Sequence, residues 1–191
     1  CTSFKIGGKA DLFVQPDSVE KLIAVISECN KNGIEILILG KGSNLLVSDG
    51  GFRGVAISTS NLDKIELIDE TTIYCEAGAS LKSLCMFALE NSLSGLEFAY
   101  GIPGTLGGAV YMNAGAYGGE MKDILVEATV LTQEGEVLVL QNEELELGYR
   151  TSVIAKKDYV VLGATVKLVK GNKDEIKAKM DELKVQRVTK Q

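Results

Sequence analysis

The chain has 191 residues, of which 46% are hydrophobic and 24% charged, and its net charge at pH 7 is −6. This composition is typical of a folded soluble protein with room for one or two compact units. The acidic balance argues against nucleic acid as a general partner, since phosphate backbones bind basic surfaces, and no apolar run approaches the roughly 20 residues of a membrane span.

The first part of the chain, residues 1–59, predicts a small α/β lobe. A helix over residues 17–33 would begin at Asp17 as its cap and end at Gly33, because polar caps and left-handed glycines mark helix ends. A strand on each side of this helix gives the order of a βαβ unit, in which we expect the second strand to be buried. The expected strands are 10–16, 34–39, 44–49 and 54–58.

The second part, residues 60–171, predicts a lobe dominated by antiparallel strands. A helix over residues 80–91 has Ser80 as its cap and an apolar stripe on one face. A hairpin turns at Glu134-Gly135. The expected strands are 64–69, 72–77, 126–131, 136–141 and 159–169.

The last segment, residues 172–191, predicts a helix capped by Asn172, with Ile176, Met180, Leu183 and Arg187 on one narrow face.

The residue types that are rare or missing exclude several chemistries. The chain has no histidine, so a Ser-His or Cys-His nucleophile, a histidine zinc site and a histidine-linked flavin are all impossible. Its four cysteines fall at irregular spacings, which predicts unpaired thiols in a reducing cytoplasm and no metal site. The chain shows no signal peptide and does not begin with methionine, so we expect upstream residues to be missing.

The segment "LILGKGSNLLV" is the first candidate binding loop. Alternating glycines let successive backbone N–H groups form a nest for an anion such as a diphosphate, with a lysine adding charge. Neither a Walker loop nor a Rossmann fingerprint fits, because the GxxxxGK[ST] spacing is absent and Leu45 occupies the third glycine position. A plain glycine turn is the alternative. The loop consists of Gly40, Lys41, Gly42, Ser43, Asn44 and Leu45.

The segment "GIPGTLGGAVYMNAGAYGGE", residues 101–120, is the second candidate. Its glycines permit close approach to the backbone, and Pro103 argues against a flexible hinge. Interleaved apolar residues, among them Tyr111 and Met112, predict burial, and buried backbone needs hydrogen-bond partners that a large planar ligand could supply. Tight packing through glycines is the alternative.

The segment "LGYRTSV" is the third candidate. Tyr149 and Arg150 follow an acidic run, and an arginine there could bind a carboxylate or phosphate or form a surface ion pair. The two glycine segments together suggest one extended ligand, with its phosphate in one and its rings in the other.

These segments, together with "TSFKIGGKAD" at the start and "RVTKQ" at the end, closely resemble the UDP-N-acetylenolpyruvoylglucosamine reductases of bacterial peptidoglycan synthesis. The resemblance implies an α+β, two-lobed FAD-binding fold of the p-cresol methylhydroxylase type. FAD would be held non-covalently between lobes 1–59 and 60–171, and helix 172–191 would lead to a C-terminal substrate domain that the chain lacks.

The resemblance also implies roles for individual residues. The loop 40–45 would wrap the FAD diphosphate, and Tyr117 and Tyr149 would lie near the substrate or the nicotinamide. The rest of the FAD would be lined by Gly101, Ile102, Pro103, Gly104, Thr105, Gly107, Gly108, Asn113, Ala114 and Gly115.

Arg150 corresponds to the active-site arginine of the family. NADPH would reduce the flavin, which would pass hydride to the enolpyruvyl group of the UDP-sugar substrate. The guanidinium would then stabilise the negative charge that develops beside the substrate carboxylate. The proton-donating serine and the glutamate of the family would follow residue 191, so we expect FAD binding but little turnover from this chain alone. A non-catalytic FAD-binding module and another flavin oxidoreductase of the same fold are the alternatives.

Overall fold

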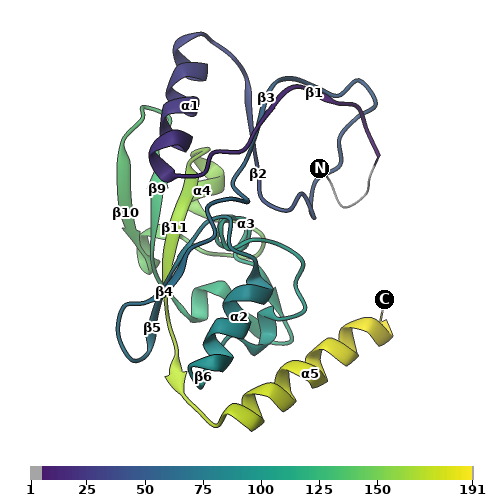
Figure 1. Ribbon diagram of the computed structural model, residues 1–191, viewed down its shortest axis with the longest axis vertical. Coiled ribbons are helices and arrows are strands. Elements are labelled where there is room, and N and C mark those ends of the chain that lie inside the picture. The colour runs from purple at the N-terminus through teal and green to yellow at the C-terminus, as the bar shows by residue number, and fades with distance from the viewer. Residues whose placement is uncertain (1–5, 191) are drawn as a thin grey trace.

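The computed structural model describes residues 6–190 (Figure 1). Its first part forms a small parallel sheet of three strands, β1 (Ala10–Val14), β2 (Ile36–Leu39) and β3 (Phe52–Ser58), with β3 between the other two. The helix α1 (Val19–Lys31) connects β1 to β2, so the predicted βαβ unit is confirmed. The predicted burial of the second strand is only partly right, because Leu39 alone is buried in β2.

The start of α1 differs from the prediction. Ser18, in extended backbone, is the cap, and its Oγ accepts a hydrogen bond from the Lys21 N–H at 3.2 Å. Asp17 lies one residue further out and pairs with the Lys21 ammonium at 2.7 Å. The predicted glycine end is confirmed, since Gly33 has a φ of +62° directly after the C-cap.

The predicted strand at residues 44–49 is wrong, because this segment is an irregular loop. The side chain of Ser43 bonds to the carbonyl of Pro103, which holds the loop against the glycine segment and away from a sheet edge. Leu46 is 69% exposed, so apolar residues in this segment do not signal burial.

The second sheet is antiparallel throughout, as predicted. The strand order is β10-β9-β11-β5-β4. The strands are β4 (Ile65–Leu67), β5 (Thr72–Glu76), β9 (Leu125–Leu131), β10 (Val137–Gln141) and β11 (Val160–Lys167).

The two sheets share part of one hydrophobic core. Leu22 and Ile26 of α1 pack in one buried cluster with Ile57 of β3, Leu131 of β9 and Leu162 of β11. The first lobe therefore buries its apolar helix face partly against the second sheet.

The helix α2 (Leu81–Glu90) matches its prediction closely. Ser80 caps it by accepting a hydrogen bond from the Ser83 N–H at 2.9 Å. The predicted apolar face is buried, and it consists of Leu81, Leu84, Cys85, Ala88 and Leu89.

The helix α5 (Lys173–Lys190) runs below α2 and along it in Figure 1. Asn172 Oδ1 accepts hydrogen bonds from the N–H groups of Asp174 and Glu175, as a cap does. Its predicted apolar residues Ile176, Met180 and Leu183 are buried.

None of the helices within residues 6–190 combines the length and the hydropathy needed to span a membrane. The remaining elements are β6 (Leu93–Ser94), α3 (Leu106–Tyr111), β7 (Gly115–Ala116), β8 (Gly119–Glu120), α4 (Val153–Lys156) and β12 (Val169–Lys170).

The buried thiols of Cys75 and Cys85 should be inert in the folded protein. Burial raises the pKa of both thiols to about 12, so almost no thiolate exists at pH 8. We expect alkylation by iodoacetamide at pH 8 to be at least 100-fold slower than in denaturant, with peptide mass mapping as the readout. Equal rates in both states would contradict this burial. The contribution of these protonated thiols to the free energy of unfolding is fully present below about pH 9. It is lost as the pH rises towards 12, because the thiols ionise first in the unfolded state.

Candidate functional site

A cleft of about 810 Å³ lies between the loop that follows β2 and the glycine segment around α3. Its volume is in the range of ligand sites. Its lining includes most of the predicted site residues: Gly40, Lys41, Gly42, Ser43, Asn44, Leu45, Ile102, Pro103, Gly104, Thr105, Gly108, Asn113, Ala114, Gly115, Tyr117, Tyr149 and Arg150.

Gly101 and Gly107 do not line the cleft. The N–H of Gly107 donates to the carbonyl of Ala77 at 2.8 Å, and a Cβ on Gly107 would lie 2.9 Å from the Ala77 Cβ. Tight packing, the alternative for the glycine segment, therefore explains Gly107. A Cβ on Gly101 would meet Arg187 Cδ at 3.1 Å.

The two glycine segments touch each other directly. Ser43 Oγ donates to the Pro103 carbonyl at 2.7 Å. A Cβ on Gly40 would overlap the hydroxyl of Thr105, the residue that caps α3. Both segments, 60 residues apart at the Ser43–Pro103 contact, thus form walls of one cleft.

The protein's own packing does not require glycine at Gly104 or Gly108. Neither has a positive φ. Among the described residues, a Cβ on either would meet only one atom within 4 Å, a hydroxyl oxygen 3.8 Å away. Since both line the cleft, their bare backbone fits a ligand that approaches the main chain closely. This geometry suits FAD, whose diphosphate and rings need backbone donors and a flat surface.

The charge of the cleft also suits a phosphorylated ligand. Lys41, Arg150 and Arg187 line it, against one carboxylate, Glu120. The ion pair with Lys122 and the hydrogen bond from Asn113 lower the pKa of the Glu120 carboxyl, so it is ionised. The cleft is therefore a positive region on a chain whose net charge is −6. Within residues 6–190 no cluster of three metal-ligating side chains occurs.

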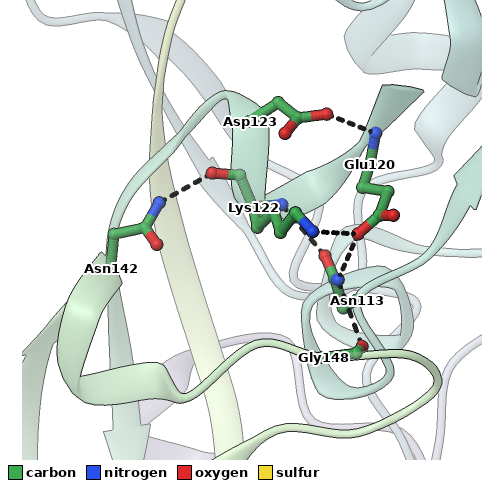
Figure 2. A network of polar contacts seen from close by, with 6 residues as sticks. All are labelled: Asn113, Glu120, Lys122, Asp123, Asn142 and Gly148. Carbon is green, nitrogen blue, oxygen red and sulfur yellow. Dashed lines mark hydrogen bonds and ion pairs between the residues drawn. The ribbon is translucent and has the colours of Figure 1, made fainter. Parts of the chain in front are cut away.

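Asn113 joins the glycine segment to the turn that carries Arg150 (Figure 2). Its Nδ2 donates to Glu120 Oε2 at 2.8 Å and to the Gly148 carbonyl at 3.2 Å, and its Oδ1 accepts from the Lys122 N–H at 3.0 Å. The residue is 5% exposed and has a φ of +45°. Both donors and the oxygen of its amide thus bond within the protein, which makes Asn113 a positioning residue in this structure.

Loss of this amide should destabilise the fold locally. We expect Asn113→Ala to lower the free energy of unfolding by about 2–3 kcal/mol, because it removes three part-buried hydrogen bonds and places alanine at a positive φ. Urea unfolding would measure the change. Asn61→Ala, at a weak exposed hydrogen bond of 3.4 Å, is the control and should change stability by less than about 0.5 kcal/mol. Equal effects would contradict the role of Asn113.

The residues expected near the substrate lie on two tight turns. Tyr117 and Gly118 have positive φ values of 55° and 84° and form the two-residue turn of the β7–β8 hairpin. Tyr149 and Arg150 lie between Gly148 and Thr151, whose backbones pair. Arg150 has a φ of +57°, and Tyr149 is 94% exposed. Left-handed backbone at non-glycine residues is typical of functional turns.

The alternative of a surface ion pair does not describe Arg150. In the described part of the chain, its guanidinium makes no ion pair, and its Nη1 lies 3.8 Å from the sulfur of Met112. The acidic neighbour Glu146 instead pairs with Lys156 at 2.6 Å. The Arg150 guanidinium is therefore available to a ligand of the cleft.

The sequence reasoning missed some of the lining residues. Tyr111 and Met112 were expected to be buried, yet both line the cleft, and Tyr111 is 42% exposed. Arg187, from α5, also lines it. The only sequence signal that Arg187 lines a site is its place at the end of the apolar stripe, because a charged residue is unusual on an apolar helix face.

Comparison with known proteins identifies the fold. The family model of the FAD binding domain matches residues 10–141. The crystal structure of the UDP-N-acetylenolpyruvylglucosamine reductase of Thermus caldophilus superposes with a TM-score of 0.77 at 35% identity, over 92% of this chain and 62% of that one. An alkyldihydroxyacetonephosphate synthase superposes with a TM-score of 0.63 at 20% identity, over 83% of this chain and 34% of that one, which shows a shared fold.

Curated relatives match along the whole chain. The UDP-N-acetylenolpyruvoylglucosamine reductase of Clostridium novyi is 50% identical over 190 residues, covering 100% of this chain and 62% of the relative. That of Listeria monocytogenes serotype 4a is 52% identical over 190 residues, covering 100% of this chain and 63% of the relative. The chain thus spans about three fifths of the length of these relatives.

The mixed helices and antiparallel sheet agree with the fold implied by the resemblance, which is confirmed. The matched residues 10–141 include the loop after β2 and the whole glycine segment. The chain belongs to the FAD-binding domain family.

Proposed function

We propose that this chain is the FAD-binding part of an NADPH-dependent reductase that converts UDP-N-acetyl-enolpyruvoylglucosamine to UDP-N-acetylmuramate for peptidoglycan synthesis. The observation that carries the proposal is the 50% identity to such a reductase over 100% of this chain. We also propose lobes at residues 1–59 and 60–171 with a connecting helix at 172–191, and a cytoplasmic location.

The residues of the cleft fit non-covalent FAD. The backbone N–H groups of loop 40–45 and the charge of Lys41 would hold the diphosphate. The flat, bare backbone at Gly104 and Gly108 would face the rest of the cofactor. When bound, FAD supplies a hydride carrier between NADPH and the substrate.

Arg150 would bind the carboxylate of the substrate and stabilise the negative charge that builds up beside it during reduction. The hydrogen bond from Asn113 to the Gly148 carbonyl holds the turn that carries Arg150 in place. Tyr117 and Tyr149, on the tips of the two turns, line the same cleft and would bind the UDP-sugar or the nicotinamide.

Added side chains at the bare glycines should weaken FAD binding without unfolding the protein. We expect Gly104→Val to raise the Kd for FAD at least 10-fold, since the valine would occupy the space of the cofactor. Quenching of flavin fluorescence on titration would measure it. Gly50→Val, at a loop glycine whose nearest neighbour is 4.0 Å away, is the control and should leave the Kd unchanged. An unchanged Kd in Gly104→Val would contradict the assigned position of FAD.

Turnover by the full-length protein tests the proposed reaction. We expect oxidation of NADPH at 340 nm that depends on UDP-N-acetyl-enolpyruvoylglucosamine, and little such activity from the 191-residue chain alone. FAD binding without substrate-dependent oxidation in the full-length protein would favour a non-catalytic FAD module. Reoxidation of its flavin by an unrelated substrate would favour another oxidoreductase of the fold.

A further inference from the structure

The apolar stripe of α5 ends in an arginine that enters the cleft. Ile176, Met180 and Leu183 are buried against the second lobe. The next position on the same face is Arg187, which is half-buried and lines the cleft. The buried residues fix the direction of this face, so the backbone of Arg187 is held beside the cleft by packing.

Gly101 makes room for the stem of this arginine. It does not line the cleft, and it has no positive φ, so neither a ligand nor the local backbone conformation requires a glycine there. The one atom that a Cβ on Gly101 would meet within 4 Å is Arg187 Cδ, at 3.1 Å. The aliphatic stem of Arg187 therefore lies against bare backbone, two residues before Pro103.

The guanidinium of Arg187 has no protein partner among residues 6–190. The neighbouring charges of α5 are paired within the helix, Lys177 with Asp181 at 2.8 Å and Lys179 with Glu182 at 2.9 Å. No ion pair or hydrogen bond involves Arg187 in this part of the chain. Its five donors therefore have no protein acceptor in the described part of the chain, and the residue lines the cleft.

We propose that Arg187 binds a phosphate group of a nucleotide in the cleft, and that Gly101 positions it. The fork of a guanidinium matches phosphate oxygens in pairs. The Ser43–Pro103 contact joins loop 40–45, which includes Lys41, to the glycine segment, and the aliphatic stem of Arg187 lies against Gly101 of that segment. Lys41 and Arg187 thus both line the cleft as cations that a phosphorylated ligand could meet, while Arg150 lies beside Met112. The inference rests on the proposed nucleotide ligands, whose phosphates belong either to FAD or to the UDP-sugar.

The test compares Arg187→Gln with Lys184→Gln in the full-length protein. Lys184 lies one turn earlier on α5, its Nζ is 6.0 Å from the Tyr100 ring centre, and its loss removes the same charge outside the cleft. FAD titration of the apoprotein and UDP titration of the FAD-loaded protein, each at two salt concentrations, separate the two sources of phosphate. We expect Arg187→Gln to raise one of the two Kd values about 10- to 100-fold and to reduce its salt dependence. Lys184→Gln should change neither Kd by more than about 2-fold.

A rise in the Kd for FAD supports the proposal with FAD as the source of the phosphate, and a rise for UDP supports it with the sugar nucleotide as the source. If neither Kd changes beyond the Lys184→Gln control, the proposal is overturned. If Arg187→Gln does not fold, Arg187→Lys replaces it, because lysine keeps the charge and lacks the paired donors of the guanidinium. Unchanged affinities for FAD and UDP in Arg187→Lys would also overturn the proposal.

The positioning role has its own readout. Gly101→Val should weaken the same ligand, and it should have no further effect in the Arg187→Gln background. An additive effect would mean that Gly101 contacts the ligand itself, which overturns its role through Arg187. A protein with no substrate-dependent NADPH oxidation but with the Arg187 effect on FAD would refute the proposed function and leave this inference standing.

Discussion

We expect Arg150→Met in the full-length protein to lower kcat of the proposed reaction by about 100- to 1,000-fold, the range found when one preorganised donor to a developing charge is removed. The guanidinium makes no ion pair among the described residues and lines the cleft from a turn with a φ of +57°. Its charge is therefore available to the transition state. Single-turnover reoxidation of the reduced flavin by substrate would measure the effect on the chemical step.

The expected pattern separates catalysis from binding and folding. The Kd for FAD and the melting temperature should stay near their original values, because Arg150 is exposed and its guanidinium makes a weak contact of 3.8 Å to the sulfur of Met112. Arg53→Met is a matched control, since Arg53 pairs with Asp11 at 2.6 Å outside the cleft and should leave kcat unchanged. A rate of flavin reoxidation that is the same in Arg150→Met and in the original protein would contradict the assigned role.

Gly78→Ala is expected to cause the largest loss of stability. A Cβ on Gly78 would fall on the carbonyl oxygen of Thr59 and lie 2.6 Å from its carbonyl carbon and 2.8 Å from the Leu62 carbonyl oxygen. All three atoms are backbone, and the Gly78 N–H donates to the same Leu62 carbonyl at 2.8 Å. The clash therefore falls where the chain after β5 passes the end of β3, and no side chain can relieve it.

We expect Gly78→Ala to lower the free energy of unfolding by about 3 kcal/mol or more. For a chain of this size that corresponds to a fall in Tm of roughly 6–12 °C or more. Gly50→Ala, at a glycine in open space with no positive φ, is the control and should shift Tm by less than about 2 °C. Equal melting temperatures for the two variants would show that the backbone at Gly78 does not lie against that of Thr59 as it does in this structure.

Local patterns predicted much of the fold. The helix 80–91 was predicted with its cap and its whole buried face, because both depend on residues three or four positions apart. The hairpin turning at Glu134-Gly135 was predicted for the same reason, and Gly135 has the expected positive φ of 88°. The cap of α1 was misplaced by one residue because Asp17 and Ser18 are both good caps, and the extended backbone falls at Ser18.

The errors in the candidate site arise from contacts that are distant in sequence. The segment 44–49 is an irregular loop, and the residue before it, Ser43, bonds to Pro103, 60 residues away. The sequence predicts one cradle along the glycine segment, yet Gly107 packs on Ala77 and Gly101 on Arg187, whereas Gly104 and Gly108 are bare towards the cleft. No spacing within residues 101–120 distinguishes these three situations.

Asn113 shows the same limit. The resemblance implies that it lines the cofactor, which stays a prediction since Asn113 lines the cleft, and its protein partners are Glu120, Lys122 and Gly148. The Gly148 contact spans 35 residues and links two turns that local reasoning treated separately. The glycine segment therefore both lines the cleft and supports the turn of Arg150.

The proposed position of FAD is the cleft between loop 40–45 and the glycine segment. A crystal structure of the protein with FAD would show whether the cofactor lies there. We expect the diphosphate within hydrogen-bond distance of the backbone N–H groups of loop 40–45, and the cofactor in van der Waals contact with Gly104 and Gly108. FAD bound elsewhere, or a side chain of the protein between the cofactor and these two glycines, would contradict it.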